Sequence, residues 1–182
     1  VFASRPAAVA APTAGLHFTQ QTLAEIRARG AEICEITLEV GLGTFQPVHA
    51  EILDQHVMHS EAYEIPPEAV EAIARARRAR RPILAVGTTV VRALEAAAQA
   101  AAARGAQPHE LMPGRATADI FIRPGHQFEL VDQLLTNFHL PRSTLLVLVA
   151  AFAGREAILS AYRHAVAEGY RFYSYGDCML IR

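Results

Sequence analysis

The sequence predicts an α/β fold, and two observations indicate it. Segments with strand character alternate with segments of helical spacing along the 182 residues. Short apolar runs are followed by glycines, hydroxyls and other polar side chains, as in a sheet or barrel whose site lies at the carboxyl ends of its strands. A hydrophobic content of 52 % suffices for one core, so residues 1–182 are expected to form a single domain.

The first third of the chain predicts three strands and one helix. A short buried strand is expected at 7–11. Thr19 then suits the N-cap of a helix that Gly30 ends. Apolar residues partly alternate with charged ones at 31–40 and at 61–65, which predicts two strands.

The middle of the chain predicts two helices around one strand. Pro66 and Pro67 end the preceding strand and open a helix over about 68–81. The continuous apolar run at 83–86 is typical of a strand covered on both faces. A helix at 90–103 follows it.

The last third predicts further elements of both kinds. Two strands are expected at 119–122 and 178–181, the first of them closed by Pro124 and Gly125. The apolar run 145–153 predicts a core helix, and an amphipathic helix is expected over about 157–169.

Composition limits the function classes. Lys plus Arg number 17 and Asp plus Glu 18, so RNA binding would need a local patch, such as the arginines within 75–81. Cys34 and Cys178 lack metal-type spacing and favour a reducing compartment, the cytoplasm. Because 145–153 is shorter than the roughly 20 apolar residues of a membrane span, no membrane association is expected. The start at Val1 predicts the interior of a longer polypeptide.

A polar stretch at 136–144 is the first candidate site. It brings an amide, an imidazole, a guanidinium and two hydroxyls directly before the apolar run, with Asn137 and His139 as the main candidates. The alternative is a polar loop in which Ser143 or Thr144 merely caps the following helix.

Two glycine-containing turns are further candidates. Gly41 and Gly43 permit close approach of backbone amides to a ligand, although a plain turn explains them equally well. The third glycine of a dinucleotide fingerprint is absent.

A second turn leads into the helix at 90–103. Gly87, Thr88 and Thr89 form with Arg92 a candidate anion or carboxylate pocket, because a cation in the first turn of a helix opposes the dipole unless an anion is bound. Glu95 is expected either to hold Arg92 or to bind ribose hydroxyls.

Histidines and tyrosines leave alternatives open. His56, His59 and Glu61 are consistent with a metal site, with hydrogen-bonding site residues or with structural histidines, and the metal is the least favoured. Tyr173 and Tyr175 either stack on a nucleobase or pack in the core.

Six blocks together are more specific than any single motif. They are 11–18, 40–48, 58–61, 87–89, 136–145 and 175–177. They resemble, in order and through nearly the whole chain, the S-adenosylmethionine:tRNA ribosyltransferase-isomerases of queuosine biosynthesis. Val90, Arg123 and Cys178 depart from the expected pattern, where a small hydroxyl, an aromatic and a small residue are usual, but none removes a motif.

The resemblance implies an activity and a fold. The activity is transfer and isomerisation of the ribosyl group of S-adenosylmethionine onto 7-aminomethyl-7-deazaguanine at the wobble position of tRNA. Epoxyqueuosine in tRNA is the product, and adenine and methionine are released. The implied fold is an α/β barrel of the triosephosphate-isomerase (TIM) type with an inserted β-barrel domain. This chain resembles the portion after the insertion, an incomplete catalytic domain without the first barrel elements.

The resemblance also implies roles for the residues of the blocks. The catalytic candidates are His17, His139 and Asp177. The base is expected to be His17, His59 or His139, and the proton donor to adenine Asp177 or Glu61 if burial raises its pKa. The substrate-binding candidates are Thr13, Gly15, Gly41, Gly43, Thr44, His59, Glu61, Gly87, Thr88, Thr89, Arg92, Glu95 and Asn137.

Partners follow from the same resemblance. S-adenosylmethionine is expected as a co-substrate and tRNA as the acceptor, with no resident cofactor or metal and a monomeric complete protein. The rival functions are a metal-dependent hydrolase on an α/β barrel and a non-catalytic tRNA-binding module.

Overall fold

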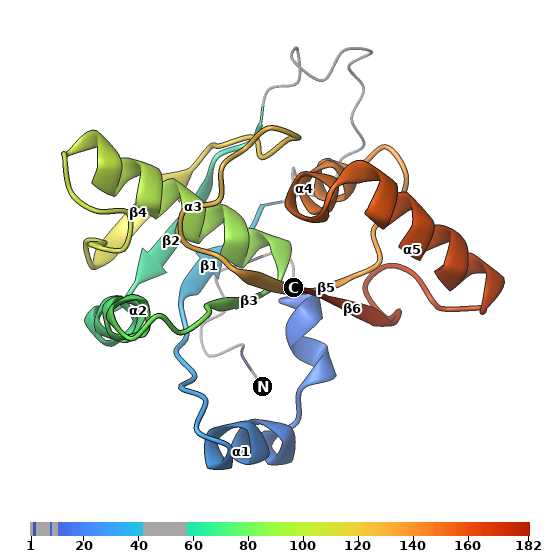
Figure 1. Ribbon diagram of the computed structural model, residues 1–182, viewed down its shortest axis with the longest axis horizontal. Coiled ribbons are helices and arrows are strands. Elements are labelled where there is room, and N and C mark those ends of the chain that lie inside the picture. The colour runs from blue at the N-terminus through green and yellow to red at the C-terminus, as the bar shows by residue number, and fades with distance from the viewer. Residues whose placement is uncertain (1, 3–7, 9–10, 42–57) are drawn as a thin grey trace.

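The fold is mixed α/β. The computed structural model describes residues 2, 8, 11–41 and 58–182 (Figure 1). In chain order, the elements are η1 (Thr13–His17), α1 (Gln20–Ala28), β1 (Thr37–Glu39), β2 (Glu61–Ile65), α2 (Pro67–Arg78), β3 (Leu84–Val86), α3 (Thr88–Ala103), β4 (Gly114–Ala118), β5 (Gln133–Asn137), α4 (Thr144–Ala153), α5 (Arg155–Ala167) and β6 (Cys178–Ile181).

The strands form two three-stranded sheets. In the first sheet β2 pairs antiparallel with both β1 and β4. In the second sheet β5 is central, parallel to β3 and antiparallel to β6. Helix α3 packs against β4 of the first sheet and against β3 and β5 of the second, so one core joins the two sheets. The α/β class is confirmed, whereas a barrel is not formed by the described residues.

Most helix starts were predicted correctly from capping residues and prolines in the sequence. Thr19 caps α1 by accepting a hydrogen bond from the amide of Thr22, and Ser143 caps α4 by accepting one from Leu146. Helix α2 begins at Pro67, as the proline pair predicted.

Two strand predictions were wrong in position or extent. The strand expected at 119–122 lies instead at Gly114–Ala118, where Ala118 pairs with Glu61, the first residue of β2. Beyond Ala118 no further residue of β2 is available for pairing, so Ile122 is buried as irregular chain. Of the strand expected at 31–40, only Thr37–Glu39 pairs. The strand expected at 7–11 lies largely outside the described residues.

Burial also differs from the prediction at two elements. Strand β3 is covered on one face, because Ala85 is 1 % exposed while Leu84 is 43 % exposed. Helix α4 is a half-buried helix rather than a core helix, since of its apolar residues only Leu148 and Val149 are fully buried.

No single described helix is both long and apolar enough to cross a bilayer. Helices α4 and α5 meet the length and composition criteria only together, and the chain bends by 115° between them.

Glu95 holds the chain that leads into β5. Its carboxylate is fully buried and accepts hydrogen bonds from the backbone amides of Glu129, Leu130 and Val131, at 2.9, 3.1 and 2.9 Å. Glu95 therefore neither holds Arg92 nor faces a ribose; it satisfies three N–H groups that the sheet does not pair.

Replacing Glu95 with Ala is expected to lower the free energy of unfolding by about 3 kcal/mol or more, because two buried amides and one partly buried amide lose a charged acceptor. Urea denaturation measures the change. Glu110→Ala is the control, since the exposed Glu110 carboxylate accepts only from the amide of Gln107, and its loss should be under about 1 kcal/mol. Equal losses in the two variants would contradict this role for Glu95.

Candidate functional site

The carboxyl edge of the second sheet gathers most of the candidate residues. Because β3 and β5 are parallel, Gly87 after β3 and Asn137 at the end of β5 lie at the same edge. The Gly87 amide donates to the carbonyl of Leu135 at 2.8 Å, which ties the turn to the neighbouring strand. Thr88 and Thr89 then begin α3 at this edge, Thr88 buried and Thr89 half-buried.

The N-terminus of α3 has an unusual cap. Gly87 is the N-cap with φ of +102°, a conformation that favours glycine, and no side chain caps the first turn. The first turn also contains no acidic residue. The free amides and the positive end of the helix dipole therefore face the carboxyl edge, an arrangement suited to a carboxylate or phosphate.

The segment η1 adds Thr13, Gly15 and His17 to this edge. It packs on β5, and a Cβ placed at Gly87 would lie 3.8 Å from the Cβ of Ala14. Gly15 is buried under the ring of Phe2, which a Cβ at this position would approach to 2.7 Å. The described contacts of Gly15 are this packing and its backbone hydrogen bonds with Pro12 and Phe18.

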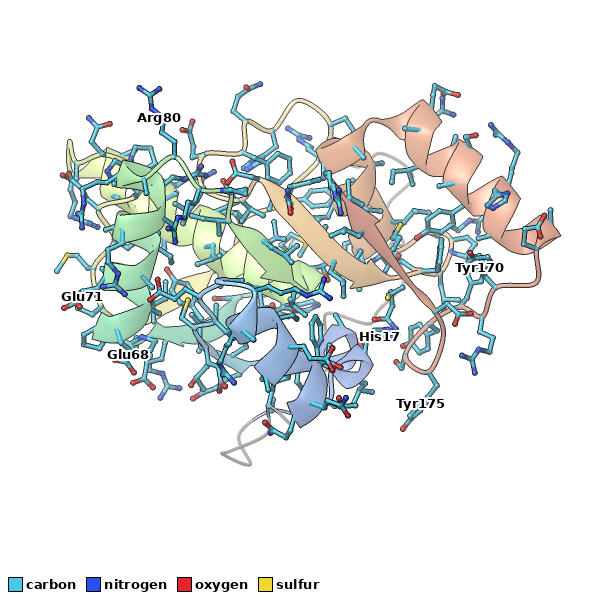
Figure 2. All side chains as sticks on the ribbon, turned by 60° about the horizontal axis from the view of Figure 1, so that its bottom comes forward. His17, Glu68, Glu71, Arg80, Tyr170 and Tyr175 are labelled. Carbon is cyan, nitrogen blue, oxygen red and sulfur yellow. The ribbon has the colours of Figure 1, made fainter. Side chains whose placement is uncertain are left out.

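The loop before β6 reaches the same place. Cys178 pairs with Asn137, so the residues that precede Cys178 lie beside the end of β5. The Asn137 side-chain amide donates to the carbonyl of Tyr173 at 3.0 Å, and the Tyr173 amide donates to the carbonyl of Phe138 at 2.9 Å. Figure 2 shows His17 on the side of the molecule where this loop projects.

Two buried polar atoms in this cluster have no hydrogen-bond partner among the described residues. They are Nε2 of His17 and Oδ1 of Asn137. Asn137 is 3 % exposed, and its other side-chain atom is already bonded to Tyr173, which orients the free oxygen. Buried polar groups are nearly always bonded, so these two atoms are suited to bond a polar ligand; Glu61 Oε1 and His126 Nε2, outside the cluster, also have no hydrogen-bond partner among the described residues.

Asp177 lies close enough to His17 for their charges to interact. Two hydrogen bonds from Arg171 hold the pKa of Asp177 below its usual range. The larger effect comes from the guanidinium and the smaller from the backbone amide. Asp177 is therefore ionised, which is opposite to the raised pKa expected of a proton donor. Arg171 is not evident from the sequence as a partner of Asp177, because no local pattern links the two residues.

His139 is buried behind the edge. Its Nε2 shares a hydrogen bond of 3.0 Å with the hydroxyl of Thr136, and its backbone amide donates to the hydroxyl of Tyr162. Burial lowers the pKa of His139 to about 4, so the imidazole is neutral near pH 7. Tyr162 was not singled out from the sequence, because it lies 23 residues further on in α5.

Arg92 and Glu61 lie away from this edge, between α3 and the first sheet. Both are nearly fully buried, and Nη1 of Arg92 is 2.8 Å from the Glu61 carboxylate. The guanidinium also donates to the carbonyls of His59, Ala118 and Ile120. Burial raises the pKa of Glu61, and Arg92 opposes the rise.

These contacts change the expected role of Arg92. The predicted anion pocket combined Arg92 with Gly87, Thr88 and Thr89, but the structure pairs its guanidinium with Glu61 instead. The imidazole of His59 is exposed, and the contact of His59 with Arg92 is made by its carbonyl.

The remaining candidates are placed apart or not described. Gly41 is exposed, and a Cβ there would meet nothing within 4 Å. Gly43, Thr44 and His56 lie outside the described residues. Within 11–41 and 58–182, no group of three His, Cys, Asp or Glu side chains is arranged to hold a metal ion.

The arginines at the end of α2 differ in their contacts with acidic residues. Arg75 pairs with Glu32, and Arg77 pairs with Asp132. Arg80 is exposed and lies on the opposite side of the molecule from His17 (Figure 2). Arg80 is thus remote from the carboxyl edge.

Comparisons with known proteins agree on one family. A family model described as queuosine biosynthesis protein matches residues 1–181. The S-adenosylmethionine:tRNA ribosyltransferase-isomerase of Burkholderia mallei (strain SAVP1) is 58 % identical over 181 residues, which are 100 % of this chain and 49 % of the relative. The protein of the same name from Heliobacterium modesticaldum is 52 % identical, over 100 % of this chain and 51 % of its own length.

A solved structure is also similar. The crystal structure of S-adenosylmethionine tRNA ribosyltransferase from Thermotoga maritima is 42 % identical to this chain, with a TM-score of 0.71. The match covers 93 % of this chain and 51 % of that one. The chain spans about half the length of the curated relatives it matches.

Glu61→Gln is expected to destabilise the protein by about 3–5 kcal/mol, because it leaves the Arg92 guanidinium buried without its counter-charge. Chemical denaturation measures the effect. In the control Glu156→Gln, the pair with Arg155 is exposed, and a change below about 0.5 kcal/mol is expected. A Glu61 variant as stable as the control would show that the pair is not needed.

His139 is expected to make stability depend on pH. The unfolded chain binds a proton at the usual pKa of 6.5 and the folded protein only at about 4. Stability is therefore complete above pH 6.5 and is lost as pH falls towards 4, by roughly 3 kcal/mol in total. His139→Gln should flatten the dependence of Tm on pH in this window, whereas His164→Gln, at an exposed position, should leave the slope unchanged. An unaltered slope in His139→Gln would refute the assignment.

Proposed function

The chain belongs to the family of queuosine biosynthesis proteins, and from this membership we propose that it contributes the ribosyl-transfer site of an S-adenosylmethionine:tRNA ribosyltransferase-isomerase. The proposed reaction moves and isomerises the ribosyl group of S-adenosylmethionine onto 7-aminomethyl-7-deazaguanine at the wobble position of tRNA. It yields epoxyqueuosine and releases adenine and methionine. Such a protein would work in the cytoplasm, where its tRNA substrate is found.

One observation carries the proposal: two buried polar atoms without described partners, His17 Nε2 and Asn137 Oδ1, belong to a cluster at the edge where the free N-terminus of α3 also lies. A sulfonium nucleoside with an amino acid tail has polar groups that suit both the unpartnered atoms and the helix N-terminus. Its methionine carboxylate suits the amides of Thr88 and Thr89 at the helix N-terminus. Its ribose hydroxyls suit the oxygen of Asn137.

His17 is the proposed general base. The positive sulfur of S-adenosylmethionine acidifies the hydrogens on the adjacent ribose carbon, and removal of one of them starts the loss of adenine. His17 has a ring nitrogen without a described partner, whereas the ring of His139 is already bonded to Thr136 and its low pKa makes it a weak base. The assignment therefore favours His17 over His139.

Asp177 supports His17 in this proposal. Its pKa lies below the usual range, so its carboxylate is ionised when His17 gains a proton. The ionised carboxylate provides a fixed negative charge near the imidazole ring. Asp177 thus acts by positioning and electrostatics, and the proton donor to adenine is a different group.

The barrel is part of the proposal as well. Since the curated relatives are about twice as long as this chain, we propose that further strands complete the two sheets in a full-length family member. The half-exposed side chains of Leu84 and Leu180, on the face of the second sheet left open here, are consistent with such a completion.

His17→Ala in a full-length family protein carrying this segment should lower the rate of adenine release by at least about a hundredfold, because a general base contributes 10²- to 10⁴-fold. Calorimetric titration with S-adenosylmethionine should show binding within a few fold of wild type, since the proposed role is in the proton transfer. Asn137→Ala should weaken S-adenosylmethionine binding.

His109→Ala is the control for this experiment, because His109 lies in the loop after α3, on no element of the cluster. Wild-type rates in the His17 and Asn137 variants would remove the proposed site. Wild-type protein that binds no S-adenosylmethionine would remove the proposed function.

A further inference from the structure

The loop at 170–177 is held by hydrogen bonds and by a glycine that no other residue can replace. The Gly176 amide donates to the carbonyl of Tyr173 at 3.1 Å, and the Asp177 amide donates to the carbonyl of Arg171 at 2.8 Å. A Cβ at Gly176 would overlap the carbonyl of Arg171, so only glycine fits there. Tyr173 has a φ of +70°, which a side chain other than glycine adopts only when its surroundings impose it.

Aromatic packing holds the loop against the rest of the protein. The ring of Phe172 lies 5.2 Å from that of Phe138 and 5.6 Å from that of Tyr162. Tyr170 also packs on Phe138, with ring centroids 5.8 Å apart. These rings account for how the loop is held, and Tyr175 takes no part in that packing.

Tyr175 is instead 88 % exposed, the highest value among the large exposed apolar and aromatic residues of the described chain. Figure 2 shows it pointing outward on the side of the molecule where His17 lies. It is two residues from Asp177, whose charge interacts with that of His17. A large aromatic ring is thus exposed on a hydrogen-bonded loop at the rim of the candidate site.

This combination favours a binding role. Burying a tyrosine side chain against a partner removes a large apolar area from water, and a preformed loop lowers the conformational entropy lost on binding. Unpaired bases stack on exposed aromatic side chains in this way, and stacking requires only the flat face of the base.

We propose that Tyr175 is a stacking platform for an unpaired base of the tRNA, beside the base that is modified. The proposal rests on the proposed function and names the part of the acceptor that this loop contacts. The ring is too exposed to hold the adenine of S-adenosylmethionine, because small-molecule sites bury most of their ligand. A base that is part of a larger RNA needs no such enclosure, since the rest of the RNA contributes to binding.

The test uses a full-length family protein carrying this segment and compares Tyr175→Ala with Tyr175→Phe. Tyr175→Ala should raise the KM for tRNA roughly ten- to a hundredfold, as expected for the loss of one stacked base. The KM for S-adenosylmethionine should change less than twofold. Tyr175→Phe should remain close to wild type, because it keeps the ring. Val166→Ala, at a 68 % exposed apolar residue of α5, is the surface control and should change neither constant.

A second measurement separates this proposal from the proposed function. Fluorescence anisotropy with an anticodon stem-loop RNA, in the absence of S-adenosylmethionine, should show weaker binding by Tyr175→Ala and unchanged binding by Tyr175→Phe. This result decides for or against the platform even if the wild-type protein releases no adenine. A rise confined to the KM for S-adenosylmethionine would assign the ring to adenine and overturn the proposal, as would unchanged RNA binding in Tyr175→Ala.

Discussion

Strand β5 is the constraint on which the rest of the structure depends. It is the centre of the second sheet, bonded to β3 on one side and to β6 on the other. Because β3 runs parallel to it and β6 antiparallel, the end of β3, the end of β5 and the start of β6 meet at one edge. Its last residue, Asn137, then binds the loop before β6 through its side chain, so the strand that forms the sheet also orders the site.

A second constraint joins the two sheets through α3. The buried Arg92 reaches Glu61 and the carbonyls of the first sheet, while Glu95 one turn later holds the chain that enters β5. Burying either charge alone would be costly, but Arg92 is paired with groups of the first sheet and Glu95 with backbone amides of the chain that enters the second sheet. This arrangement fixes the helix between the sheets and presents its free N-terminus to the carboxyl edge.

The three catalytic candidates differ in their surroundings, which the sequence did not show. His139 is neutral because it is buried, and Asp177 is ionised because Arg171 bonds to it. His17 keeps a ring nitrogen without a partner among the described residues. Burial and hydrogen bonding, rather than residue type, therefore distinguish these three side chains.

The sequence by itself determined the α/β class, the family and the features set by neighbouring residues, such as the caps at Thr19 and Ser143 and the start of α2 at Pro67. These depend on interactions within a few residues, which a pattern records. Only the tertiary structure decided the position of β4, whose small and polar residues carry no strand pattern, and the partner of Arg92, which lies 31 residues away at Glu61. The reason is physical: strand pairing and burial of charge depend on which distant segments meet, and local spacing contains no record of that meeting.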